Sequence, residues 1–187
     1  METLDAIKKR RSIRKFKDKK VDKSLIEDIL NCGILAPSPK NRQPWEFVIL
    51  IDSMKDKVVD IMKGYEKNKL ELITYHIKNK FSYSGSYTAK VIKNAPVLIL
   101  VFRKKEDNWI VGDSLALGAC IQNMSLRATD LGLGSLWIRD IIYTAEEISE
   151  LVGKKGLELN SALCIGYPDG DAKSTSRKNL KDITKWH

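Results

Sequence analysis

The longest apolar run of the sequence, residues 95–102, limits the fold more than any other feature. It is far shorter than the roughly 20 residues that a helix needs to cross a membrane. Because proline is tolerated at the start of a strand, Pro96 followed by this run predicts a buried strand over residues 97–102. A second run predicts a strand over residues 45–51 that is covered on both faces. Both strands therefore need helices packed around a sheet.

Apolar residues at helical spacing predict those helices. The longest begins at Asp113, runs to residue 131 and ends at Gly132. Small side chains on one of its faces suit close helix packing; that face comprises Leu115, Gly118, Ala119, Gln122, Leu126 and Thr129. Two further helices are predicted over residues 3–9 and 53–62. Another begins at Asp22 and ends before Pro37, and the last begins at a Thr144–Glu147 capping box and ends near Gly153.

The remaining segments complete an α+β pattern. Two short strands are predicted over residues 133–138 and 161–165, and residues 64–89 are predicted to form a helix plus a mobile loop. Strands and helices do not alternate as in a doubly wound sheet, and the paired glycines at Gly132 and Gly134 precede a strand. A Rossmann motif and a P-loop are therefore absent. We expect one domain over residues 1–187, with a mixed sheet of four to five strands flanked by helices.

Positive charge is concentrated at the two ends of the chain. Of 187 residues, 33 are Lys or Arg and 24 are Asp or Glu, a net charge of +9. Residues 1–23 hold 10 basic against 4 acidic side chains, residues 171–187 hold 5 against 2, and the rest balance. Because the ends of a domain are often close together, they could share one anionic ligand. A pair of solvated basic tails is an equally good interpretation of the charge alone.

The aromatic content of these ends favours a small ligand. Nucleic-acid sites usually interleave basic and aromatic residues, yet the first basic end contains only Phe16 and the second only Trp186. A small phosphorylated ligand therefore fits better than a polymer, and we expect no nucleic-acid partner.

Histidine and cysteine are too sparse for most catalytic centres. The chain has two histidines, His76 and His187, so a metal cluster or a Ser-His-Asp triad is not expected. Three cysteines without C-x-x-C spacing, Cys32, Cys120 and Cys164, are best interpreted as small buried side chains. A bound cofactor should then supply the chemistry. The N-terminal stretch has no apolar signal region, so we expect a cytoplasmic protein without a membrane partner.

Arg10, Ser12 and Arg14 form the first candidate binding motif. In an extended chain the three side chains point the same way and span about 13 Å. Guanidinium groups match phosphate oxygens two at a time, so one end could bind a phosphate while the other reaches a ring system. Arg177 and Lys178 could complete the phosphate site from the other end of the chain.

Four sequence blocks, in this order and spacing, resemble the nitroreductase family of flavin mononucleotide (FMN) enzymes. They cover residues 10–16 (RRSIRKF), 36–45 (APSPKNRQPW), 130–138 (DLGLGSLWI) and 165–168 (IGYP), the last with the basic tail around Arg177. The resemblance implies a layered nitroreductase-like fold in an intertwined homodimer.

The resemblance also implies roles for single residues. Arg10, Ser12 and Arg177 would bind the FMN phosphate, with Arg11 and Lys178 as neighbours, and Arg14 would stabilise negative charge at the flavin pyrimidine edge. A loop covering the flavin from the second subunit would comprise Pro37, Ser38, Pro39 and Asn41, and a backbone amide contact to flavin N5 would come from Ile138, Arg139 and Asp140. Family members often have glycine, or an acid and glycine, at the last two of these positions. This chain departs from that pattern, because it has Arg139 and Asp140 there.

The implied activity is a ping-pong oxidoreductase reaction. NADH or NADPH would deliver hydride through flavin N5 to a nitroaromatic, quinone or similar small acceptor. A specialised relative that fragments flavin or removes halogen reductively is the alternative within the family. A non-catalytic protein that binds flavin or nucleic acid is the alternative outside it.

Overall fold

The fold is built on a four-stranded antiparallel sheet. The computed structural model describes residues 1–68 and 85–187. Its strands are β1 (Trp45–Leu50), β2 (Val97–Lys104), β3 (Gly134–Ile138) and β4 (Leu157–Gly166), in the order β1-β2-β4-β3. Every neighbouring pair is antiparallel. The predicted α+β class is confirmed, but among the described residues the parallel pairing expected of a mixed sheet is limited to one bridge, between Ser12 and Ser135.

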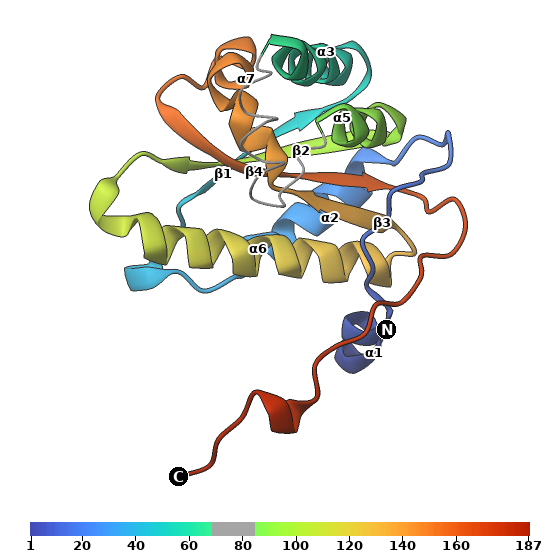
Figure 1. Cartoon of the computed structure of the whole chain (residues 1–187), viewed down its shortest axis with the longest axis vertical. Helices are drawn as coiled ribbons and strands as arrows, with labels where there is room; N and C mark the ends of the chain where they lie inside the picture. The colour runs from blue at the N-terminus through green and yellow to red at the C-terminus, as the bar shows by residue number, and fades with distance from the viewer. Residues whose placement is uncertain (69–84) are drawn as a thin grey trace.

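Helices cover both faces of this sheet (Figure 1). The helices α2 (Lys23–Gly33) and α6 (Ile110–Asp130) lie on one face, and α3 (Asp52–Asn68), α5 (Gly85–Asn94) and α7 (Ala145–Leu151) lie on the other. Alternate residues of β2 enter the two cores, with Leu98, Leu100 and Phe102 on the α3 and α5 side and Val97, Ile99 and Val101 on the α2 and α6 side. The predicted buried strand over residues 97–102 is therefore confirmed.

The two ends of the chain run together below the sheet. The first helix, α1 (Thr3–Lys9), packs near the end of α6, where the N-terminal amino group binds Asp130 at 2.7 Å. After β4 the chain passes α1 and ends in a tail that extends away from the sheet, with a single 3₁₀ turn, η4 (Leu180–Asp182) (Figure 1). Three large apolar side chains of this tail are exposed, namely Leu180, Ile183 and Trp186.

The helix caps differ from the predicted ones. Helix α6 begins at Ile110, and Asp113 is buried against a distant arginine instead of opening the helix. Thr144 precedes α7 but forms no capping box, because its hydroxyl donates to the Ile141 carbonyl at 3.1 Å. Asp22 precedes α2 as predicted, yet its side chain makes no cap hydrogen bond. None of the three side chains thus acts as the predicted cap: Asp113 pairs with a distant residue, and Thr144 bonds within its own turn.

Two observed elements are longer than the sequence predicted. The predicted helix over residues 53–62 extends to Asn68 in α3, and the predicted strand over residues 161–165 begins at Leu157 in β4. Strand β1 was expected to be covered on both faces, but it is an edge strand and Ile49 is 41% exposed. Part of the mobile loop predicted within residues 64–89 lies outside the described residues. None of the described helices is long and apolar enough to span a membrane.

Helix α6 has two different faces. It packs on the sheet through larger apolar side chains, including Leu117, Ile121 and Met124. The small-residue face predicted for close helix packing is only partly buried: Ala119 packs against the core, whereas Leu115 is 71% exposed. The exposed part of this face therefore lies around Leu115.

Candidate functional site

The basic segment that contains Arg10, Ser12 and Arg14 is extended, as predicted. The Ile13 amide donates to the Ser135 carbonyl at 2.9 Å, which docks the segment on the start of β3. Further along, the Lys17 amide donates to the Tyr167 carbonyl at 2.9 Å, and the Asp169 amide donates to the Lys15 carbonyl at 3.0 Å. The segment therefore lies between β3 and the stretch that leads to the C-terminal tail.

Gly134 allows this docking. A Cβ atom at Gly134 would lie 2.6 Å from Cγ1 of Ile13 and 2.8 Å from its Cβ, which is closer than real contacts permit. Since Ile13 packs onto β3 and side chains alternate along an extended chain, Ser12 and Arg14 face away from the strand, where both are exposed. The glycine thus sets the distance between the candidate binding residues and β3.

A cavity of about 350 Å³ lies beside this segment. One wall comprises Ser12, Ile13, Arg14 and Lys15, and the other comprises residues 169–173 and Thr175. The head and the tail of the chain therefore meet at one hollow. Arg177 lies two residues beyond this wall, and its guanidinium donates to Thr175 Oγ1 at 2.7 Å.

The predicted binding arginines lack carboxylate partners, and of them Arg14 lines this hollow. Within the part of the chain that the structure describes, no acid lies within 4 Å of the guanidinium groups of Arg10, Arg11, Arg14 or Arg177. Arg11 donates to the carbonyls of Lys8 and Arg10, and Arg14 donates to the Ser12 carbonyl at 3.3 Å. By contrast, three other arginines of the chain form ion pairs, namely Arg42, Arg103 and Arg127. The guanidinium groups of these four arginines are thus free of ion pairs to the described residues, although Asp169 and Asp171 also line the hollow.

The residues predicted to contact flavin N5 lie at the other end of β3. Strand β3 begins beside Ser12 and ends at Ile138, so the two ends of the candidate site are about 10 Å apart along it. Asp140 opens the 3₁₀ helix η3 (Asp140–Thr144). The exposed Arg139 side chain donates to the Tyr143 hydroxyl at 3.0 Å and lies 5.3 Å from the centre of that ring.

The loop of residues 37–41 does not join this site within one chain. Pro39 contacts Gly112 near the start of α6, whereas the basic segment docks just beyond the end of α6, as Figure 1 shows. A helix of 21 residues separates the two places by about 30 Å. Pro37, Ser38, Pro39 and Asn41 are therefore not brought together with Arg10, Ser12 and Arg14 in the protomer.

The structure also identifies a residue that the sequence did not single out. Arg42, in the same loop, pairs with Glu106 and Asp113. These acids follow 64 and 71 residues later, so no local spacing could reveal the contact. The only sequence signal was a basic residue inside the second family block.

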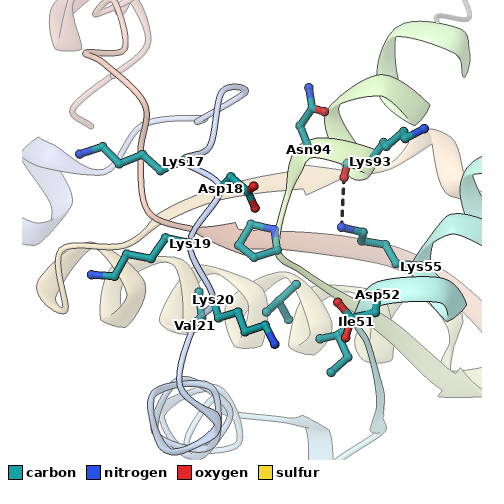
Figure 2. Close-up of a pocket in the computed structure, with 12 residues that line it drawn as sticks. Lys17, Asp18, Lys19, Lys20, Val21, Ile51, Asp52, Lys55, Lys93 and Asn94 are labelled. Carbon is teal, nitrogen blue, oxygen red and sulfur yellow. Dashed lines mark hydrogen bonds between the residues drawn. The ribbon is translucent and has the colours of Figure 1, made fainter.

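Another cavity, of about 230 Å³, lies next to the basic segment but suits an anion poorly (Figure 2). In the close-up, Lys17 and Lys19 point away from it, while the carboxylates of Asp18 and Asp52 lie toward it. Lys55 is buried there and donates to the carbonyls of Lys93, at 3.1 Å, and of Ala95. None of the predicted site residues lines this cavity.

The cysteines behave as structural side chains. Burial raises the pKa of both the Cys120 and the Cys164 thiols to about 12, so both stay protonated near neutral pH. Cys32 is partly exposed, and all three are free thiols. Among residues 1–68 and 85–187, no group of three His, Cys, Asp or Glu side chains could hold a metal ion. His76 lies outside the described residues.

Comparison with known proteins agrees with this fold and these motifs. The chain is 31% identical to the iodotyrosine deiodinase of Thermotoga neapolitana over 88% of each chain. It is 27% identical to YfhC of Bacillus subtilis (strain 168), which is named provisionally as an NAD(P)H nitroreductase, over 95% of this chain and 90% of that protein. A Desulfovibrio desulfuricans protein crystallised in complex with FMN superposes with a TM-score of 0.78 at 29% identity, over 100% of this chain and 97% of that one. The model of the nitroreductase family matches residues 7–167, and the chain therefore belongs to that family.

Proposed function

We propose that the protein is an FMN-dependent oxidoreductase that uses NADH or NADPH to reduce a nitroaromatic, a quinone or a similar small acceptor. The observation that carries this proposal is the docking of the basic segment on β3, which places arginines, without ion-pair partners among the described residues, on the same strand that leads to Ile138. FMN, when bound, would supply the redox step by accepting hydride at N5 and passing electrons to the acceptor. The protein would supply position and charge.

The phosphate end of the site is assigned to both termini of the chain. Arg10, Ser12 and Arg177 would bind the phosphate, with Arg11 and Lys178 adding positive charge. Their support is the hollow that Ser12 and Thr175 share and the lack of carboxylate partners among the described residues. An anion placed there would gain charge-assisted hydrogen bonds without breaking existing ion pairs.

The ring end of the site is assigned to Arg14 and to the backbone of Ile138, Arg139 and Asp140. Arg14 is exposed and lies two residues beyond Ser12, so its guanidinium can reach further along the ligand than the phosphate. A cation at the pyrimidine edge would stabilise the negative charge of a reduced flavin. A backbone amide of the stretch Ile138, Arg139 and Asp140 would contact flavin N5.

A homodimer would complete the site. The loop of residues 37–41 lies about 30 Å from the basic segment of its own chain, so it could cover a flavin only in a second copy. Exposed apolar side chains on α6 and on the tail provide a surface for that copy, including Val111, Leu115, Leu180, Ile183 and Trp186.

Light scattering should give a mass of about 42 kDa, twice the 21.2 kDa of one chain. Leu115→Glu should shift the protein toward the monomer and weaken FMN binding, because it places a charge on the small-residue face of α6. Ile49→Glu, at the exposed edge strand, is the matched control and should change neither property. A monomeric wild-type protein with full FMN affinity would contradict the dimer.

The visible spectrum tests the function itself. The purified protein should be yellow, and anaerobic NADH or NADPH should bleach the flavin absorbance, which a nitroaromatic or a quinone should then restore. Bound flavin that neither nucleotide reduces would indicate a flavin-binding protein without this activity. A colourless protein that binds DNA in a salt-dependent manner would indicate the nucleic-acid alternative.

Reductive dehalogenation is the second candidate. It is favoured by the 31% identity to the Thermotoga neapolitana iodotyrosine deiodinase over 88% of both chains. If the chemistry is the same, the reduced protein should release iodide from iodotyrosine and regain its yellow colour. Reoxidation by quinones with no iodide release would leave the nitroreductase-type activity as the better assignment.

A further inference from the structure

The loop of residues 37–44 has an unfavourable backbone. Three of its residues other than glycine have left-handed φ values, namely 50° at Lys40, 54° at Asn41 and 48° at Gln43. Such conformations cost free energy and persist only when surrounding contacts hold them. Within the loop, the Gln43 amide donates to Ser38 Oγ at 2.9 Å. This one bond spans the left-handed residues but does not attach the loop to the rest of the molecule.

Arg42 attaches the loop to the start of α6. Its Nε donates to Asp113 Oδ1 at 3.1 Å, and its Nη2 donates to Glu106 Oε2 at 2.8 Å. The Arg42 Cζ atom lies 4.4 Å from the centre of the Trp109 ring. Hydrogen bonds to Asp113 and then Glu106 raise the pKa of Arg42, so the group stays charged. The Asp113 side chain is fully buried, so this ion pair is shielded from solvent on the Asp113 side.

Beside this ion pair, the Pro39 ring packs against the backbone of Gly112. A Cβ atom at Gly112 would lie 2.9 Å from Cγ of Pro39, so the loop packs where the helix has no side chain. Pro39 and Arg42 thus attach the loop at two points, one on each side of the left-handed residues Lys40 and Asn41. The loop and the first turn of α6 form one unit.

We propose that Arg42 is a positioning residue that holds the loop of residues 37–44 ready to cover a flavin before the flavin binds, by tying it to Asp113 and Glu106. The identity of the ligand rests on the proposed function. The shape of the loop does not depend on a ligand, because every contact described above is made within the protomer. Ser38 and Asn41, on either side of Pro39 and Lys40, are thereby presented in a fixed arrangement, which lowers the ordering cost of binding.

Two substitutions test this role. Arg42→Met removes the charge, and Arg42→Lys keeps a cation beside Asp113 but cannot reach two acids and cover Trp109 at once. Arg127→Met is the matched control, because Arg127 also binds two acids, Asp28 and Asp130, but lies near the opposite end of α6. Since Arg42→Met could destabilise the protein, Arg42→Lys keeps the test valid.

FMN binding to the apo-protein should be measured by quenching of flavin fluorescence. We expect Arg42→Met to raise the Kd at least tenfold, Arg42→Lys to raise it about threefold or more, and Arg127→Met to change it less than twofold. The visible circular dichroism of flavin at saturation should change in both Arg42 variants and not in Arg127→Met. Hydrogen exchange of residues 38–43 without FMN should be faster in both Arg42 variants only.

The outcomes separate the two proposals. A wild-type protein that does not bind FMN would overturn the proposed function, and with it the flavin-specific part of this inference. Arg42 variants that match the wild type in FMN affinity and in hydrogen exchange of residues 38–43 would overturn the positioning role while leaving the proposed function intact.

Discussion

Replacing both Arg10 and Arg177 with alanine should release FMN and raise its Kd at least a hundredfold. Each charge-assisted hydrogen bond to a phosphate contributes about 1.5–3 kcal/mol, and two such losses correspond to about 3 kcal/mol or more. Neither guanidinium has a carboxylate partner among the described residues, so the substitutions should cost little stability. The variant should therefore be folded and colourless.

The control for this variant removes equal charge from the same two ends. Lys8→Ala with Lys185→Ala takes one cation from the α1 region and one from the tail, outside the matched family blocks. Equilibrium titration with FMN at fixed ionic strength should give a wild-type Kd for this pair, apart from a small change from long-range electrostatics. If the two double variants weaken binding equally, the assigned phosphate site is wrong and only overall charge matters.

Gly134→Ala should lower the free energy of unfolding by about 1–3 kcal/mol and weaken FMN binding more than tenfold. The added Cβ would lie 2.6–2.9 Å from three carbon atoms of Ile13, so the basic segment must move away from β3. Ser12 and Arg14 would move with it, because they flank Ile13 in the same extended segment. Chemical denaturation and FMN titration measure the two effects separately.

Gly156→Ala is the matched control for this glycine. No atom lies within 4 Å of a Cβ at Gly156, and its backbone is not in the left-handed region. It should therefore leave both stability and FMN affinity close to the wild-type values. Gly134→Ala that loses stability but keeps full FMN affinity would show that docking of Ile13 does not position the binding residues.

Much of the local structure was predictable. The helix over residues 3–9, the strand over residues 97–102 and the end of α6 just before the left-handed Gly132 depend on side-chain periodicity and on glycine and proline within a few residues. The caps at Asp113 and Thr144 were wrong, because each polar side chain found a different partner in the folded chain. Local patterns cannot rank such competing partners.

In the candidate site, too, some features follow from the local sequence and others depend on contacts between distant residues. The alternation of Arg10, Ser12 and Arg14 and the basic tail at Arg177 predicted a shared anion site, and the fold places Ser12 and Thr175 around one hollow. The roles of the individual side chains stay predictions. Arg42 could not be found in this way, since its contacts cross 64 and 71 residues of sequence.

The sequence alone determined where most of the helices and strands form and where positive charge is concentrated, because these properties depend on near neighbours. The tertiary structure decided that the basic segment docks on β3 over Gly134, and that the loop of residues 37–44 is held about 30 Å away at the start of α6. Those placements depend on packing between segments distant in the chain, and the periodicity of one segment contains no information about its partner.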